Sequence, residues 1–164
     1  MKIDICREGI MKTGLLDLIN DLPEGLIMAE IGSWQGESTE MFLKSGKVYK
    51  LFSIDAYGND ERMMKAEDIF KYRVKGFNVV KLRMTSNEGL PKCDTLNFVY
   101  IDGNHTYEWV KTDIQNSLKK ICSGGIIAGH DYAKRDNVGV IEAVNELLGV
   151  PDKIYDDTSW IKYL

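Results

Sequence analysis

Two short segments contain both histidines of the chain, each beside carboxylates that could act with them. Asp102 and His105 lie in the first segment, and His130 and Asp131 form the second. Each segment follows an apolar run, so these residues would end neighbouring strands. Carboxylates suit Mg²⁺ and a histidine admits Mn²⁺, Fe²⁺ or Zn²⁺, so Asp102, His130 and Asp131 could bind one divalent ion. Histidine titrates near neutrality, so His105 could take a proton from a substrate hydroxyl.

These residues also have ordinary structural explanations. A carboxylate after a strand can cap the next helix or accept hydrogen bonds from loop backbone, and His105 could be an exposed loop residue without a chemical role. The chain has only two histidines. A metal phosphohydrolase centre built around the His130-Asp131 dipeptide needs several more, so that class is excluded.

A glycine turn is the second candidate site. Gly32 and Gly36 separate the apolar run 25–31 from a stretch with helical character. Glycine lets the backbone turn sharply and approach a ligand, and the N–H groups that begin a helix attract anions. The G-x-x-x-G spacing is neither the dinucleotide fingerprint nor a P-loop. Asp55 ends another apolar run about twenty residues later, where such folds place a ribose-binding carboxylate.

These features predict a nucleotide-like cofactor at the turn, with tight packing of the two glycines as the alternative. If the cofactor lies against Gly32, a branched side chain there should block its binding. We expect such a variant to remain folded.

Strands and helices are predicted to alternate. The predicted strands are residues 26–31, 48–54, 79–82, 96–101 and 126–129, and the predicted helices are residues 10–20, 37–43, 61–74, 107–121 and 138–148. Segments 153–156 and 160–164 could form a final antiparallel pair. This order predicts an α/β fold, a doubly wound, mostly parallel sheet whose ligands bind at the carboxyl ends of the strands.

Composition predicts one intracellular domain over residues 1–164, with an N-terminal helical segment over residues 1–25. Hydrophobic residues make up 44% and charged residues 28%, an ordinary globular balance, and the net charge of −4 argues against a nucleic-acid partner. The three cysteines are odd in number and lack C-x-x-C spacing, which fits a reducing cytoplasm. No apolar run is long enough to cross a membrane, so no membrane partner is expected.

Several motifs together resemble a known family. They are A-E-I-G-S-W-Q-G-E-S-T (29–39), S-I-D (53–55), F-V-Y-I-D-G-N-H-T-Y (98–107), S-G-G-I-I-A-G-H-D-Y (123–132) and V-G-V-I-E-A-V (138–144). The chain resembles the class I S-adenosylmethionine-dependent methyltransferases over about residues 26–164. Within that class it is most similar to the small methyltransferases related to macrocin O-methyltransferases and cephalosporin hydroxylase-type proteins.

The resemblance implies a Rossmann-like, seven-stranded sheet whose last strand is antiparallel. It places the methionine part of the cofactor over the turn from Gly32 to Gly36, the ribose on Asp55 and the adenine near Ser86. Three more residues are implied to belong to the cofactor site, namely Glu30, Ser33 and Asp102.

In metal-dependent members, carboxylates that end the fourth and fifth strands hold Mg²⁺. Those positions match Asp102, His130 and Asp131 here, although the family more often has Asp-Asp, Glu-Asp or Asp-Asn at the last two.

The resemblance implies O-methylation of a small hydroxylated molecule, such as a sugar or a secondary metabolite, assisted by Mg²⁺ or another divalent metal. The loops 57–64 and 132–137, or a partner subunit of a homo-oligomer, would complete the site. Two alternatives remain, a catalytically silent cofactor-binding or scaffold protein and an NAD-linked oxidoreductase. The missing G-x-G-x-x-G disfavours the oxidoreductase.

Overall fold

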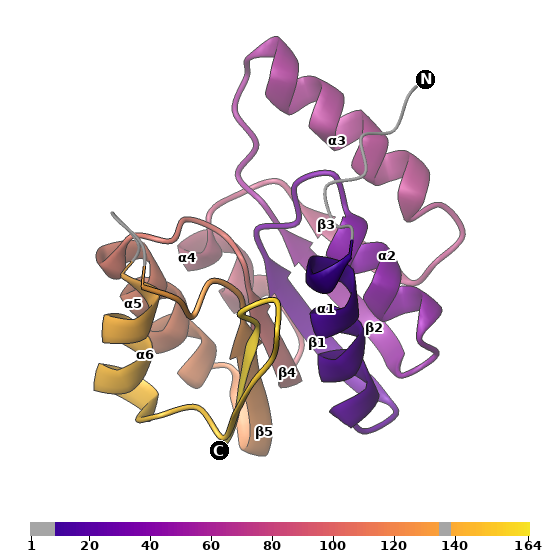
Figure 1. The fold of residues 1–164 in the computed structure, drawn as a ribbon. Helices are drawn as coiled ribbons and strands as arrows, with labels where there is room; N and C mark the ends of the chain where they lie inside the picture. Colours follow the sequence, from indigo (N-terminus) through magenta and orange to yellow (C-terminus); the bar gives the residue numbers. More distant parts are fainter. Residues whose placement is uncertain (1–8, 135–138) are drawn as a thin grey trace.

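Strands and helices alternate through the described part of the chain, which comprises residues 9–134 and 139–164 of the computed structural model (Figure 1). The strands are β1 (Leu26–Ile31), β2 (Val48–Ile54), β3 (Val79–Leu82), β4 (Leu96–Ile101), β5 (Ile121–Gly129), β6 (Lys153–Ile154) and β7 (Trp160–Tyr163). The helices are α1 (Ile10–Asp21), α2 (Glu37–Lys44), α3 (Glu61–Arg73), α4 (Ser86–Gly89), the 3-10 turn η1 (Leu90–Lys92), α5 (Tyr107–Leu118) and α6 (Val140–Leu148).

The strands form a seven-stranded sheet in the order β3-β2-β1-β4-β5-β7-β6. The first five strands of this order run parallel, whereas β7 is antiparallel to both β5 and β6. The fold is therefore a Rossmann-like, mostly parallel sheet with antiparallel C-terminal strands, which confirms the predicted fold class.

The register brings the ends of the central strands to one edge of the sheet. Ile31, the last residue of β1, pairs with Ile54 of β2 on one side and with Ile101 of β4 on the other. Ile101 in turn pairs with Gly129, the last residue of β5. The residues that follow these strand ends therefore meet at the carboxyl edge, where the sequence predicted the site.

Side chains alternate between two cores, one on each face of the sheet. In β1, Ala29 and Ile31 pack into the core beneath η1, α5 and α6, whereas Leu26 and Met28 pack into the core beneath α1 and α2. Figure 1 shows α5 and α6 on one side of the sheet and α1 and α2 on the other. Both faces of the parallel strands are thus covered, as is usual for parallel sheets.

Most predicted elements occupy the expected residues, and four strands match at both ends: β1, β2, β3 and β4. The predicted helix 107–121 ends earlier, at Leu118, because Ile121 already pairs with Leu96 as the first residue of β5. The strand therefore continues through Gly124 and Gly125 and is longer than predicted. The short elements α4 and η1 were not predicted.

Residues 135–138 lie outside the described residues, as do residues 1–8. The start of the predicted helix at 138 and most of the predicted closing loop 132–137 fall there, as does part of the predicted N-terminal segment. No helix among residues 9–134 and 139–164 is long and apolar enough to cross a membrane.

Candidate active site

A cavity of about 630 Å³ opens at the carboxyl edge of the sheet. Five predicted site residues line it, namely Gly32, Asp55, Ser86, Asp102 and His105. Other residues of the lining are Ile31, Trp34, Ile54, Ala56, Tyr57, Gly58, Met63, Met84, Thr85, Gly103, Asn104, Trp109 and Asp113.

Backbone hydrogen bonds hold the strand-end residues in place. The N–H of Gly32 donates to the carbonyl of Ile54 at 2.9 Å, and the N–H of Asp102 donates to the carbonyl of Ile31 at 2.8 Å. The sheet ladder therefore continues one residue beyond each strand. This fixes the backbone from which the Asp102 side chain projects.

Glycine at position 32 is required by the backbone that follows β4. Gly32 has φ +86°, and a Cβ atom there would lie 2.2 Å from the carbonyl oxygen of Asp102. The space beside it is therefore filled by protein. Contrary to our expectation, a branched side chain at Gly32 would clash with the fold itself before it met a cofactor. Gly36 is constrained in the same way, with φ +77° and the ring of Phe70 beside it.

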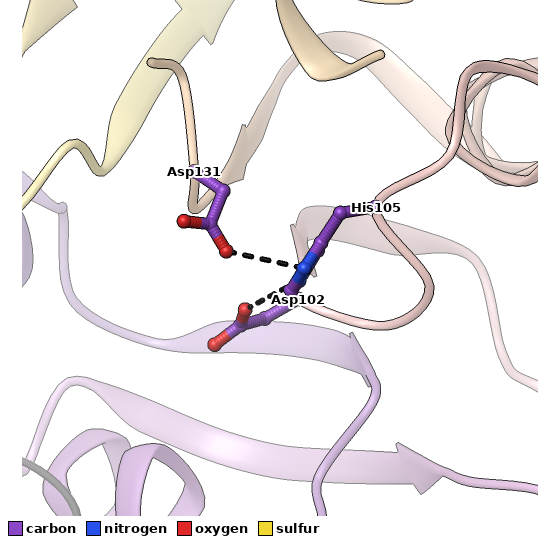
Figure 2. A group of neighbouring side chains, drawn as sticks. All are labelled: Asp102, His105 and Asp131. Carbon is purple, nitrogen blue, oxygen red and sulfur yellow. Dashed lines mark hydrogen bonds and ion pairs between the residues drawn. The ribbon is translucent and has the colours of Figure 1, made fainter. Parts of the chain in front are cut away.

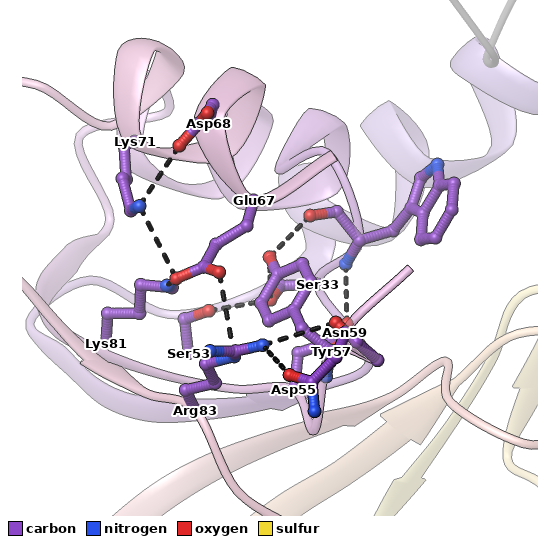
Figure 3. Close-up of polar contacts among 12 residues, drawn as sticks. Ser33, Ser53, Asp55, Tyr57, Asn59, Glu67, Asp68, Lys71, Lys81 and Arg83 are labelled. Atoms are coloured by element: carbon purple, nitrogen blue, oxygen red, sulfur yellow. Dashed lines mark hydrogen bonds and ion pairs between the residues drawn. The ribbon is translucent and has the colours of Figure 1, made fainter. Parts of the chain in front are cut away.

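Asp55 is oriented by two backbone N–H groups. Its Oδ2 accepts from the N–H of Trp34 at 2.8 Å, and its Oδ1 accepts from the N–H of Tyr57 at 2.9 Å (Figure 3). Each carboxylate oxygen has a further lone pair. Asp55 therefore lines the cavity as a preoriented acceptor for hydroxyl groups.

The loop after β2 is held by a network that the sequence did not reveal (Figure 3). The Tyr57 hydroxyl donates to the carbonyl of Trp34 at 2.5 Å, and burial raises the pKa of Tyr57. The Arg83 guanidinium donates to the Asn59 side chain at 2.9 Å and to the Gly58 carbonyl at 3.2 Å. These contacts join the loop to the glycine turn and to the end of β3.

Two of the residues implied for the cofactor site, Glu30 and Ser33, lie behind the turn, and neither they nor Gly36 line the cavity. Glu30 is fully buried and accepts hydrogen bonds from the hydroxyls of Ser38, at 2.5 Å, and Thr39. Ser33 is buried and accepts from the Ser53 hydroxyl at 2.7 Å. Glu30 thus anchors the first turn of α2 to β1, and Ser33 connects the glycine turn to β2.

A cluster of two carboxylates and an imidazole lies at the ends of β4 and β5 (Figure 2). His105 Nε2 is 3.3 Å from Asp102 Oδ1, and His105 Nδ1 is 3.2 Å from Asp131 Oδ2. One ligand atom from each residue can be chosen so that all three lie within 4.8 Å of one another. Asp131 has φ +59°, a left-handed conformation that is uncommon for residues other than glycine.

His130 lies behind this cluster. It is buried, with Nδ1 3.4 Å from Asp131 Oδ2 and 3.8 Å from Asp102 Oδ1, and its Nε2 points toward Asp157 Oδ2 at 3.9 Å. The cavity lining includes His105 but not His130. The structure therefore brings Asp102 and Asp131 together as predicted, and places His105 between them on the cavity side.

Asp113 of α5 is a further polar group in the cavity wall, and it was not predicted from the sequence. Only 3% of its surface is exposed, and the Ser86 hydroxyl donates a hydrogen bond to its Oδ1. Burial raises the pKa of this carboxyl to about 6. Its position offered a signal, because Asp113 lies on the same buried face of α5 as Val110 and Ile114.

The cavity is acidic. Three carboxylates line it, from Asp55, Asp102 and Asp113, and none of the described lining residues is a lysine or arginine. Such a lining favours a cationic ligand over a phosphate-bearing one.

Comparison with known proteins adds a family assignment. The family model for the methyltransferase domain matches residues 29–132. The uncharacterized protein R132 of Acanthamoeba polyphaga mimivirus is 30% identical over 135 residues, which cover 76% of this chain and 60% of R132. The chain thus spans less than two thirds of the length of that relative.

Solved structures share the fold. The TDP-rhamnose 3'-O-methyltransferase CalS11, an enzyme in calicheamicin biosynthesis, matches with a TM-score of 0.64 and 14% identity, covering 93% of this chain and 79% of CalS11. The N-methyltransferase NodS from Bradyrhizobium japonicum WM9 matches with a TM-score of 0.63 and 17% identity, covering 92% of this chain and 91% of NodS. The family model covers more than half of the chain, which therefore belongs to the methyltransferase-domain family, in agreement with its resemblance to the class I S-adenosylmethionine-dependent methyltransferases.

Proposed function

We propose that the chain transfers the methyl group of S-adenosylmethionine to a hydroxyl oxygen of a small molecule, such as a sugar or a secondary metabolite. One observation carries this proposal. Asp102 and His105 line the same cavity as Asp55 and also belong to the cluster with Asp131. Groups that could hold and deprotonate a hydroxyl therefore lie beside the proposed cofactor site. The fold shared with CalS11, a TDP-rhamnose 3'-O-methyltransferase, is compatible with a sugar hydroxyl as the acceptor.

The cavity fits this cofactor in size and charge. Its volume of about 630 Å³ lies in the range of small-molecule sites. The three carboxylates in its lining complement the positive sulfonium, and Asp55 is oriented to accept from ribose hydroxyls. A dinucleotide would place a pyrophosphate in the same acidic lining. The negative charge of the lining therefore supports S-adenosylmethionine over NAD as the cofactor. It equally supports methyl transfer over hydride transfer as the reaction.

The chemistry required of the protein is positioning and proton removal. A sulfonium methyl is already electrophilic, so the site must align a nucleophile with the S–CH₃ bond and take up its proton. A neutral imidazole has one donor and one acceptor nitrogen. His105 can donate to one flanking carboxylate and accept the hydroxyl proton at its other nitrogen. The second carboxylate then stabilises the imidazolium.

The same cluster fits a divalent ion. Two carboxylates and an imidazole suit Mn²⁺, Fe²⁺ or Zn²⁺, and Mg²⁺ accepts the carboxylates. Asp102 and Asp131 would hold the ion together with His130, which the sequence predicted and which leaves His105 free to accept the proton. With His105 as the third ligand instead, that imidazole would not be the base. When bound there, a divalent ion supplies a Lewis acid that lowers the pKa of a coordinated hydroxyl.

Two measurements test the function. Transfer of tritiated methyl groups to a panel of sugars, phenols and amines should label a hydroxylated acceptor. Labelling of amines alone would instead indicate N-methylation, as in NodS, and cofactor binding without any transfer would indicate a silent binding protein.

Treatment with EDTA should stop methyl transfer while leaving cofactor binding intact, and Mg²⁺ or Mn²⁺ should restore the transfer. Full activity in EDTA would eliminate the metal.

A further inference from the structure

Each ring nitrogen of His130 faces a carboxylate. Nδ1 lies 3.4 Å from Asp131 Oδ2 and 3.8 Å from Asp102 Oδ1, whereas Nε2 lies 3.9 Å from Asp157 Oδ2. Nε2 is buried and makes no hydrogen bond among the described residues. A buried polar nitrogen is costly without a partner. The acceptor that faces it is Asp157, a residue that does not line the cavity.

The Asp157 carboxylate is held in place by the residues that begin β7. Its side chain is fully buried. Its Oδ1 accepts from the N–H of Ser159 at 2.9 Å, and its Oδ2 accepts from the Ser159 hydroxyl at 3.0 Å. Trp160, the next residue, pairs with Gly129, which directly precedes His130. The pairing of β7 with β5 therefore brings Asp157 to His130.

The helix α1 leaves room for this carboxylate. Gly14 lies in the interior of α1, where glycine is unfavourable. A Cβ atom at Gly14 would overlap the Asp157 carboxylate. The fold thus encloses a carboxylate between α1, Ser159 and His130, although a buried carboxylate is costly unless it is paired and hydrogen-bonded. This arrangement indicates that Asp157 serves His130.

A divalent ion in the cluster would decide which nitrogen of His130 carries the proton. A neutral imidazole has one N–H and one lone pair, and a metal takes the lone pair. Ligands of a tetrahedral zinc ion lie about 3.4 Å apart, close to the distances from Nδ1 to Asp131 and Asp102. With Nδ1 bound to the ion, the proton is on Nε2 and faces Asp157. Histidine ligands commonly donate their other N–H to a carboxylate in this way.

We propose that Asp157 is a positioning residue that accepts the Nε2–H of His130 and thereby aims Nδ1 at a divalent ion held by Asp102 and Asp131. This inference rests on the metal-assisted form of the proposed function. It selects His130 rather than His105 as the nitrogen ligand. It also gives a role to a carboxylate outside the cavity lining.

Long-range ¹H–¹⁵N NMR of the full chain, labelled at histidine and titrated with Zn²⁺, tests this orientation. The chain has two histidines, so His105→Asn identifies the signals of each. Zn²⁺ should move Nδ1 of His130 into the metal-bound range and leave Nε2 protonated. Zinc bound by His105 alone, zinc bound at Nε2 of His130, or no zinc binding would overturn the inference. Methyl transfer in EDTA is measured separately, so the proposed function would still stand.

The role of Asp157 is tested by the affinity for Zn²⁺ in calorimetric titrations. Asp157→Asn keeps the size of the side chain but has one acceptor oxygen, which cannot serve both the Ser159 N–H and His130 Nε2–H. It should bind Zn²⁺ about 10- to 100-fold more weakly. Asp156→Asn removes the same charge at the neighbouring exposed position and should bind Zn²⁺ normally.

S-adenosylhomocysteine binding to the same variants separates positioning from damage to the fold. Its affinity should be the same for Asp157→Asn, Asp156→Asn and the unmodified protein. An unchanged Zn²⁺ affinity in Asp157→Asn, or a parallel loss of S-adenosylhomocysteine binding, would overturn the inference. If Asp157→Asn does not fold by circular dichroism, the NMR result on the unmodified protein decides. Absence of S-adenosylhomocysteine binding to the unmodified protein would overturn the proposed function instead.

Discussion

His105 is the side chain most directly tied to the proposed proton transfer, because both of its ring nitrogens face carboxylates at the edge of the cavity. His105→Ala should lower kcat by about 10²–10⁴ if the imidazole removes the proton. His105→Asn restores a polar group without a titratable nitrogen, so it should not recover the rate. The measurement is steady-state transfer to the best acceptor of the panel at saturating cofactor. A kcat equal to that of the unmodified protein would eliminate His105 as the base.

Asp113 gives a prediction for stability against pH. Burial raises its pKa from 3.8 to about 6 in the folded protein. An acid with a raised folded pKa contributes its full stability below the unfolded value and loses it as pH rises through the folded value. Between pH 4 and pH 7 the protein should therefore lose up to about 3 kcal/mol of unfolding free energy relative to Asp113→Asn.

Urea unfolding at several pH values measures this difference, with Thr112→Ala as the control that should follow the unmodified protein. Parallel stability profiles for the unmodified protein and Asp113→Asn would contradict the prediction.

At the level of residues, the sequence predicted strand-end groups best. Asp55 and Asp102 were identifiable because a polar residue directly after an apolar run must lie at the edge of the sheet. Asp113 was missed because it lies within a helix. The sequence shows that this position carries a carboxylate, but it does not show that the side chain lines the cavity. The sequence also did not show which of the two histidines lines the cavity, because that depends on side-chain direction; His105 does.

At the level of elements, period and length decided what could be predicted. The parallel strands β1 and β4 are short, almost fully buried apolar runs bounded by turn residues, so their limits were evident. The helix α4 has four residues and no period to detect. Its capping box, Thr85 with Glu88, was the one available sequence signal. The early end of α5 could not be predicted, because pairing of Ile121 with Leu96 is a tertiary effect.

Two glycines with similar positive φ angles test why the turn after β1 needs Gly32. Gly25 has φ +76° and no atom within 4 Å of the point that a Cβ would occupy, whereas Gly32 has φ +86° and a carbonyl oxygen 2.2 Å from that point. Gly25→Ala should lose about 1–2 kcal/mol from left-handed strain alone. Gly32→Ala should lose at least about 2 kcal/mol more through overlap with the backbone of Asp102. Chemical denaturation measures both, and equal losses would show that this close approach does not matter.

For the whole molecule, the doubly wound topology brings separate chemical groups to one cavity. The turn after β1, the carboxylate after β2, the hydroxyl of α4 and the cluster after β4 and β5 all lie at the carboxyl edge, although they span residues 32 to 131 of the chain. The sheet thus supplies the position, and the proposed chemistry belongs to the residues at the strand ends. CalS11 and NodS share this fold, although one is named an O-methyltransferase and the other an N-methyltransferase.

All of the proposed chemistry requires that this cavity bind S-adenosylmethionine, and calorimetry with its product S-adenosylhomocysteine tests that most directly. The unmodified chain should bind one equivalent. Asp55→Ala should bind about 10-fold more weakly or worse, because it loses a charged acceptor for the ribose. Asp94→Ala, which removes a surface carboxylate paired with Lys50, should bind normally. Absence of binding, or an affinity for Asp55→Ala equal to that of the unmodified protein, would contradict the assignment.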